Sequence, residues 1–122
     1  MRPEMGEKEH SITAKIADAE WTGESGAKYN FAIYPFGTDF KAVGAVYIVT
    51  KRTVKSDGGG NHNFIYVGQT GDLSTRFDDH HKAACFKKNG ANCICIHLNG
   101  KESQRLDIET DLVMHYNPPC NG

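Results

Sequence analysis

Long apolar runs are missing from this chain of 122 residues, and so is an excess of charge of either sign. No stretch approaches the roughly 20 apolar residues that a membrane-spanning helix needs. Lysine and arginine number 14 against 15 aspartates and glutamates, so the net charge is −1, which does not fit a protein that coats nucleic acid through bulk charge. The remaining composition, 39% hydrophobic and 24% charged, excludes wholesale disorder and predicts one ordinary globular domain.

A secretory signal is also missing, because Met1 to His10 include three glutamates and no apolar run. We therefore expect a cytoplasmic protein in a reducing compartment. Residues 1–10 are expected to form a flexible N-terminus, followed by a single domain over residues 11–122. Free thiols are expected at all four cysteines, namely Cys85, Cys93, Cys95 and Cys120.

Short apolar and β-branched runs predict strands over residues 11–21, 29–35, 44–50, 64–68 and 92–98. Residues 51–63, with three consecutive glycines, predict a long mobile hairpin loop. Asp72 is the expected N-cap of a helix that continues to about Lys88, and a second helix over residues 101–116 ends before Pro118-Pro119. These elements predict an α/β (α+β) fold, a small and mostly antiparallel sheet with helices packed on it. Residues 11–43 form an N-terminal extension of a core over residues 44–121.

The second helix carries a carboxylate where an apolar side chain is expected. Glu109 falls on the stripe of Leu106, Val113 and Tyr116, with spacings of three and four residues. A desolvated carboxylate needs a positive or hydrogen-bonding partner. Glu109 is therefore either part of a buried ion pair, at the edge of the stripe, or part of a functional site.

The first helix repeats this pattern, because Arg76 and His80 lie beside an apolar stripe of Leu73, Phe77 and Ala84. One charge on an inward face is common in proteins. An arginine, a histidine and a glutamate on the inward faces of one small domain are typical of a functional site.

Two tyrosines complete this group, since Tyr47 and Tyr66 lie in the middle of two predicted strands. A tyrosine in such a position is more often a core residue with a satisfied hydroxyl group. The order of the motifs changes that interpretation. A strand tyrosine is followed by a Tyr-x-Gly strand, a helix with an arginine, a helix with a glutamate and a terminal Pro-x-x-Asn.

This order resembles the GIY-YIG nuclease superfamily over residues 44–121. The first motif of the family is present as Gly44 followed by Ala45-Val46-Tyr47, and the second as Tyr66-Val67-Gly68 followed by Gln-Thr-Gly-Asp-Leu. Arg76 follows ten positions after Tyr66, and His80 one helical turn later, where members have His or Tyr. The segment Glu109-x-x-Leu-Val-x-x-Tyr-x-Pro-x-x-Asn121 is similar to the closing helix of the family.

Three positions depart from the family pattern. Ala45 stands where glycine is usual, although Gly44 is adjacent. Tyr47 and Tyr66 are 19 residues apart, so residues 51–63 are an insertion relative to the compact hairpin of the family. Gln69 stands where some relatives have a lysine, which weakens an expected phosphate contact.

The resemblance implies an enzyme, a metal-dependent endonuclease that hydrolyses phosphodiester bonds in nucleic acid, DNA rather than RNA. Glu109 would hold a single Mg²⁺ or Mn²⁺, which suits a lone carboxylate completed by water and phosphate oxygens. Arg76 would bind the scissile phosphate through its guanidinium fork. The resemblance favours Tyr47 as general base, with Tyr66 and His80 positioning water or relaying the proton, but the sequence alone does not separate base from helper. Asn121 would fix the helix end or orient the site.

Basic residues flank this expected site and are candidates for contacts with the nucleic-acid backbone: Lys51, Arg52, Lys55, Lys82, Lys87 and Lys88. No known reader of base sequence is evident, so specificity would come from nucleic-acid shape, a partner protein or an oligomer. One such site makes one nick, so cleavage of both strands would require a homodimer or successive cuts.

Two other functions compete with the nuclease. The first is a nucleic-acid-binding module of the same fold without activity, for which Ala45 and Gln69 are the only support. The second is a zinc-stabilised interaction domain built on the cysteines and histidines, namely His81, Cys85, Cys93, Cys95 and His97. Zinc needs four tetrahedral ligands, whereas alternate residues of one strand lie about 7 Å apart, so small core cysteines are the favoured interpretation.

Overall fold

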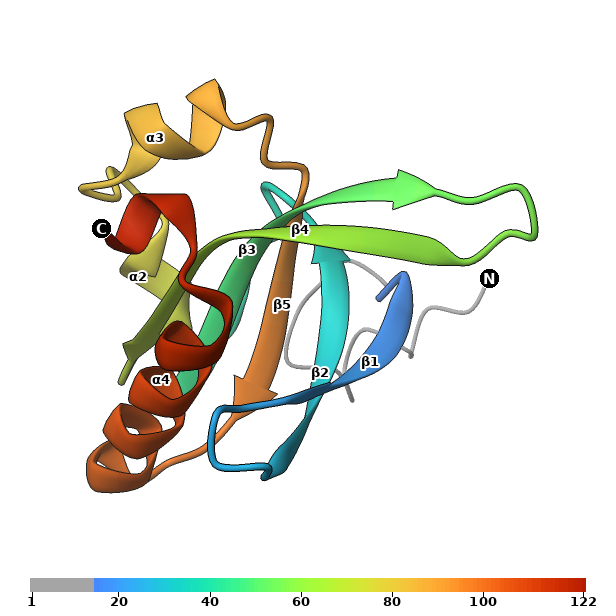
Figure 1. The fold of residues 1–122 in the computed structure, drawn as a ribbon. Coiled ribbons are helices and arrows are strands. Elements are labelled where there is room, and N and C mark those ends of the chain that lie inside the picture. Colours follow the sequence, from blue (N-terminus) through green and yellow to red (C-terminus); the bar gives the residue numbers. More distant parts are fainter. Residues whose placement is uncertain (1–14) are drawn as a thin grey trace, which may run out of the picture.

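Five antiparallel strands form one sheet in the computed structural model, which describes residues 15–122 (Figure 1). They are β1 (Ala17–Thr22), β2 (Lys28–Pro35), β3 (Ala45–Val54), β4 (Gly60–Thr70) and β5 (Cys93–Leu98), in the spatial order β1-β2-β5-β3-β4. The expected α+β fold with an antiparallel sheet is thus confirmed, and β1 and β2 extend the sheet beyond β5. Residues 11–14 of the first predicted strand lie outside the described residues.

The hairpin between β3 and β4 differs from the predicted mobile loop over residues 51–63. β3 continues to Val54 and β4 begins at Gly60, so only residues 55–59 form the turn. β5 pairs with β3 only as far as Thr50, and residues 51–54 with their β4 partners form a two-stranded arm beyond the sheet (Figure 1). The prediction was wrong because the arm is mostly solvent-exposed, and its polar residues lack the apolar alternation that indicates a strand.

The helices α2 (Leu73–Arg76) and α3 (Ala83–Lys88) pack on one face of the sheet through Leu73 and Phe86. Asp72 is the N-cap, as predicted, and accepts a hydrogen bond from the backbone N–H of Ser74 at 2.9 Å. The predicted continuous helix to Lys88 is wrong, because the chain leaves the helical conformation after Arg76 and Asp79 has φ of 62°. The predicted apolar stripe also ends early, since Ala84 is exposed.

The long helix α4 (Glu102–Tyr116) lies on the opposite face, beside β4 (Figure 1). Its existence and bounds agree with the prediction, and Leu112 packs against the aliphatic side chains of β3 and β4. The buried face of α4 is rotated about the helix axis relative to the predicted apolar stripe, because Leu106 is 44% exposed whereas Arg105 is only 6% exposed. Ile108 and Glu109 lie partly buried between Arg105 and Leu112.

The chain ends in the short 3₁₀ helix η1 (Pro119–Asn121), which is tied to α3 by a disulfide between Cys85 and Cys120. The prediction of four free thiols is therefore wrong for this pair, whose members are 35 residues apart in sequence. Cys93 and Cys95 are free and buried. No helix among the described residues is long and apolar enough to cross a membrane.

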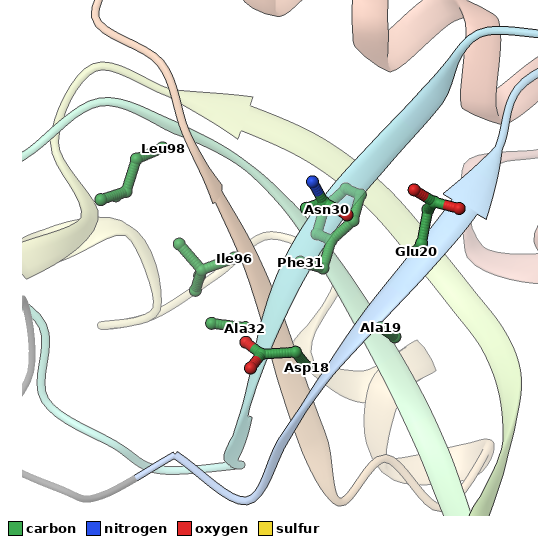
Figure 2. Close-up of a pocket in the computed structure, with 8 residues that line it drawn as sticks. All are labelled: Asp18, Ala19, Glu20, Asn30, Phe31, Ala32, Ile96 and Leu98. Carbon is green, nitrogen blue, oxygen red and sulfur yellow. The ribbon is translucent and has the colours of Figure 1, made fainter.

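A shallow hollow of about 480 Å³ lies over β1, β2 and β5 (Figure 2). Ala32 and Ile96 contribute apolar surface, and β1 carries the carboxylates of Asp18 and Glu20 beside it. None of the sequence-predicted site residues lines this hollow. We therefore place the candidate site by its chemistry, on the β3–β4 side of the sheet.

Candidate active site

The hydroxyl oxygen of Tyr47 is the atom at which three segments meet. Tyr47 is the third residue of β3 and is fully buried. The Nε–H of Arg76, at the end of α2, donates a hydrogen bond to this oxygen at 2.8 Å. His80, in the non-helical segment after α2, places its Nε2 atom 2.8 Å from the same oxygen.

The tautomer of His80 follows from its second contact. The Nδ1 atom accepts a hydrogen bond from the backbone N–H of Lys82 at 3.0 Å, so in the neutral ring the proton is on Nε2. Burial lowers the pKa of His80 to about 4, and the positive charge of Arg76 adds to this effect. At neutral pH His80 is therefore uncharged and donates its Nε2–H to Tyr47.

The Tyr47 oxygen thus accepts two hydrogen bonds, one from Arg76 and one from His80. Two donors stabilise a phenolate, because hydrogen bonds to the charged form favour it. Burial acts in the opposite direction and raises the pKa of Tyr47 above its usual value of 10, with Arg76 opposing this increase and Glu109 adding to it. The resting phenol therefore keeps its proton at neutral pH, and added positive charge would lower its pKa.

Gly68 allows the rings to approach each other. It lies directly opposite Tyr47 in the β3–β4 register, and a Cβ atom at this position would lie 2.5 Å from the Tyr47 oxygen and 2.8 Å from the Tyr66 ring. The rings of Tyr47 and Tyr66 have centroids 6.0 Å apart. The spacing Tyr66-x-Gly68 therefore has a direct steric cause.

Arg76 links both tyrosines to Glu109. Burial acts to lower the pKa of the Arg76 guanidinium, but hydrogen bonding to Tyr47 and the proximity of Tyr66 raise it overall. Glu109, partly buried on α4, has its pKa raised by desolvation, an effect that the charge of Arg76 reduces. The structure thus brings the predicted Tyr47, Tyr66, Arg76, His80 and Glu109 into one electrostatically coupled group.

Glu109 is the member of this group whose chemistry suits a metal ion. Among residues 15–122 there is no cluster of three or more His, Cys, Asp or Glu side chains that could hold a metal. A hard cation such as Mg²⁺ keeps several waters and needs only one or two protein carboxylates, so a single glutamate fits it. A structural zinc site requires four ligands, and Cys85, one of the residues in the zinc alternative, is part of the disulfide.

Asn121 holds the backbone of β4 next to this group. Its Oδ1 atom accepts a hydrogen bond from the Val67 N–H at 2.9 Å, and its Nδ2 atom donates one to the Val67 carbonyl oxygen at 2.9 Å. Val67 lies between Tyr66 and Gly68 in the sequence. Asn121 is therefore placed to orient β4 and Tyr66, and the neighbouring Cys85–Cys120 disulfide anchors it.

Arg105 is a residue that the sequence analysis missed. Its Nε–H donates to the Oε1 atom of Gln69 at 2.9 Å, and Nη1 donates to the carbonyl oxygen of Asn99 at 3.1 Å. A Cβ atom on Gly44 would lie 2.7 Å from Nη1 and 2.9 Å from the same carbonyl oxygen of Asn99, and it is this fixed backbone oxygen that favours a glycine here. Gln69 thus has a role of its own here, holding α4 one helical turn before Glu109. Arg105 lies four residues before Glu109, which lies three residues before Leu112, so helical spacing places Arg105 on the same side of α4. This spacing was the signal in the sequence that could have identified Arg105.

The six predicted basic residues do not form one surface. The side chain of Lys51 lies beside Gly90, because a Cβ atom added to this glycine would be 3.4 Å from the Cδ atom of Lys51. Lys87 and Lys88 lie in the last turn of α3. Lys82 lies at the start of α3 and Lys55 is exposed at the tip of the arm. Arg52 lies on the other side of the arm, where its charge lowers the pKa of His62 after the larger effect of burial.

Comparison of the chain with protein-family models, with curated proteins and with solved structures found no match. The chemistry of this site is therefore inferred from its own residues. The observation that matters most is the pair of donors on the oxygen of Tyr47, next to a guanidinium and a carboxylate.

Proposed function

We propose that this protein is a divalent-metal-dependent endonuclease that hydrolyses phosphodiester bonds in nucleic acid, DNA rather than RNA. The observation that carries the proposal concerns the Tyr47 oxygen, which accepts hydrogen bonds from Arg76 and His80. The charge of Glu109 raises the pKa of the same hydroxyl group. Phosphodiester hydrolysis needs a base, a cation for the phosphoryl oxygens and a metal ligand. The resemblance of residues 44–121 to GIY-YIG nucleases supports the same assignment.

Tyr47, in its phenolate form, is the proposed general base and takes a proton from the attacking water. The water oxygen forms a bond to phosphorus while the bond from phosphorus to the leaving oxygen breaks, and that oxygen takes up a proton. Arg76 uses Nε for Tyr47, which leaves its terminal N–H groups to bind the phosphoryl oxygens. His80, neutral and a donor, holds the phenolate in place until it takes the proton.

Glu109 would hold Mg²⁺ or Mn²⁺ through its carboxylate. When bound, the cation supplies positive charge that neutralises the phosphate and favours ionisation of the attacking water. The charge of Glu109 raises the pKa of Tyr47 in the free protein, so compensation of that charge lowers it. Glu109 thereby connects metal loading to the fraction of Tyr47 that is ionised and able to accept a proton.

Nicking of supercoiled plasmid in Mg²⁺ or Mn²⁺ tests the proposal, with the wild type compared with Glu109→Gln. Asp107→Asn is the matched control, because Asp107 is an exposed carboxylate on the same helix. We expect metal-dependent nicking by the wild type and the control, and a loss of about a hundredfold or more in Glu109→Gln. The proposal is overturned if Glu109→Gln nicks like the wild type. It is also overturned if the wild type fails to cleave every substrate offered, namely plasmid DNA, single-stranded DNA, branched DNA and RNA.

A further inference from the structure

A second hollow, of about 320 Å³, borders the candidate active site and shares His80 with it. It lies between the end of β2, the segment after α2 and the helix α3. Three phenylalanine rings line it together with the imidazole, namely Phe36, Phe77 and Phe86. Because His80 also contacts the Tyr47 oxygen, one side chain connects this aromatic pocket to the proposed reacting groups.

The rings of the aromatic pocket are fixed at different angles. His80 and Phe86 have ring centroids 4.8 Å apart, and Phe36 meets Phe86 edge-on at 6.3 Å. Phe86 and His80 are buried, whereas Phe36 is 43% exposed. A large aromatic ring left in solvent at the opening of an aromatic pocket is typical of a surface that receives a ligand.

The charge that lines the aromatic pocket is positive. Among the described residues that line it, Lys87 is the charged one and Ala83 and Ala91 are the remaining ones, while the carboxylates of Asp39 and Asp78 line the adjoining hollow that also contains Phe36 and Phe77. Lys51 and Lys88 lie close to the same end of α3. A planar aromatic ligand attached to phosphates combines the two properties that these residues recognise, because nucleobases stack on aromatic side chains whatever their sequence.

We propose that the aromatic pocket binds an unpaired nucleobase beside the phosphodiester that the Tyr47 site cleaves. This inference rests on the proposed nuclease function. A base within a duplex must first be unstacked and unpaired, at a cost of a few kcal/mol, whereas a base in a flap, bulge or single strand is free to enter. The aromatic pocket therefore gives the enzyme a preference for unpaired or distorted nucleic acid, without reading base sequence.

Binding rather than cleavage tests the aromatic pocket, with every variant built on Glu109→Gln so that the strand stays intact. The probe is an oligonucleotide duplex with one bulged 2-aminopurine, whose fluorescence reports stacking, and the reference is the fully paired duplex. We expect Phe36→Ala to weaken binding of the bulged probe by about 5- to 150-fold, because one stacked base contributes about 1–3 kcal/mol, and to leave binding of the paired duplex nearly unchanged. Phe36→Trp retains a stacking surface and should restore binding.

Leu98→Ala is the matched control, because Leu98 is a large apolar side chain of similar exposure, 49%, outside the aromatic pocket. The aromatic pocket proposal is overturned if Phe36→Ala binds the bulged probe within twofold of its parent, or if it weakens both probes equally. Failure of the proposed function is seen separately, as absence of cleavage by the wild type. A loss of binding in Phe36→Ala that is confined to the bulged probe, without any cleavage by the wild type, would support the pocket and reject the nuclease.

Discussion

Alternate residues of β3 face two different environments. Tyr47 points to the face covered by α2 and α3, where it meets Arg76 and His80. Its neighbours Val46 and Ile48 point to the opposite face and pack, fully buried, in the cluster that contains Leu112 of α4. Both faces bury apolar side chains, but the α2–α3 face, called the polar face below, also buries the hydroxyl group of Tyr47 and the imidazole of His80 beside Arg76. The comparison indicates that Val46 and Ile48 contribute packing alone, whereas the polar face also holds groups that cost stability to bury.

The largest expected effect concerns Arg76, on the polar face. Arg76→Ala should lower the single-turnover cleavage rate by about 10²- to 10³-fold, because one preorganised donor to the reacting phosphate is lost. The free energy of unfolding should change little, since the Arg76 side chain is only partly buried. Arg76→Lys keeps the positive charge but lacks the planar set of N–H donors of a guanidinium, so it should recover only a small part of the cleavage rate. Equal rates for wild type and Arg76→Ala would contradict the assignment.

Ile48→Ala on the opposite face should have the reverse effect. Ile48 is fully buried, so the substitution should lower the free energy of unfolding by about 2–5 kcal/mol, through lost burial and the cavity that remains. Denaturant unfolding measures this value. The cleavage rate per folded molecule should stay close to that of the wild type. A large loss of rate with unchanged stability would show that the two faces do not divide these roles.

A smaller effect is expected from the ionisation of His80. Free histidine titrates near 6.5, whereas burial lowers the pKa of folded His80 to about 4. Between these values the unfolded chain binds more protons than the folded chain, so stability falls as the pH decreases from 6.5 to 4, by about 1–3 kcal/mol from this residue. Urea unfolding at pH 7 and at pH 4.5 measures the change, and His80→Asn should show less of it. An identical pH dependence in both proteins would exclude the buried neutral imidazole.

The smallest expected effect concerns the basic residues near α3. Lys51→Ala and Lys87→Ala should each reduce the slope of log affinity against log salt for nucleic acid by about 1, if each side chain contacts one phosphate. Lys28→Ala is the control, because Lys28 is exposed at the start of β2, away from α3. Salt titrations of binding measure the slopes. The same slope in all variants would remove these lysines from the nucleic-acid surface.

Much of the fold was predictable from local patterns. The strands β3, β4 and β5 were predicted because each contains a short continuous apolar run, which is buried on both faces of the sheet. The helix α4 was predicted from its apolar stripe and from the prolines that follow it. The arm at residues 51–54 was missed because this pair of strands is mostly exposed to solvent, so its polar residues show no apolar alternation. The break after Arg76 was missed because Asp79 adopts a left-handed conformation, which is uncommon for a residue other than glycine and is not signalled by the local pattern.

The candidate site was predictable as a set of residues but not as an arrangement. Motif order was sufficient to select Tyr47, Arg76 and Glu109. The proton on His80 Nε2 depends on the Lys82 N–H, and the position of Asn121 depends on a disulfide between residues 35 positions apart. Such tertiary contacts have no local signal in one sequence.

Single-turnover cleavage by Tyr47→Phe and Tyr66→Phe, measured as a function of pH, tests the central claim most directly. Both substitutions keep a ring on the same face, so packing is preserved. If the Tyr47 oxygen takes the proton, Tyr47→Phe should lose about 10²- to 10⁴-fold in rate and the pH dependence due to this group, while Tyr66→Phe should lose less and keep that dependence. A Tyr47→Phe variant that cleaves at the wild-type rate would contradict the account.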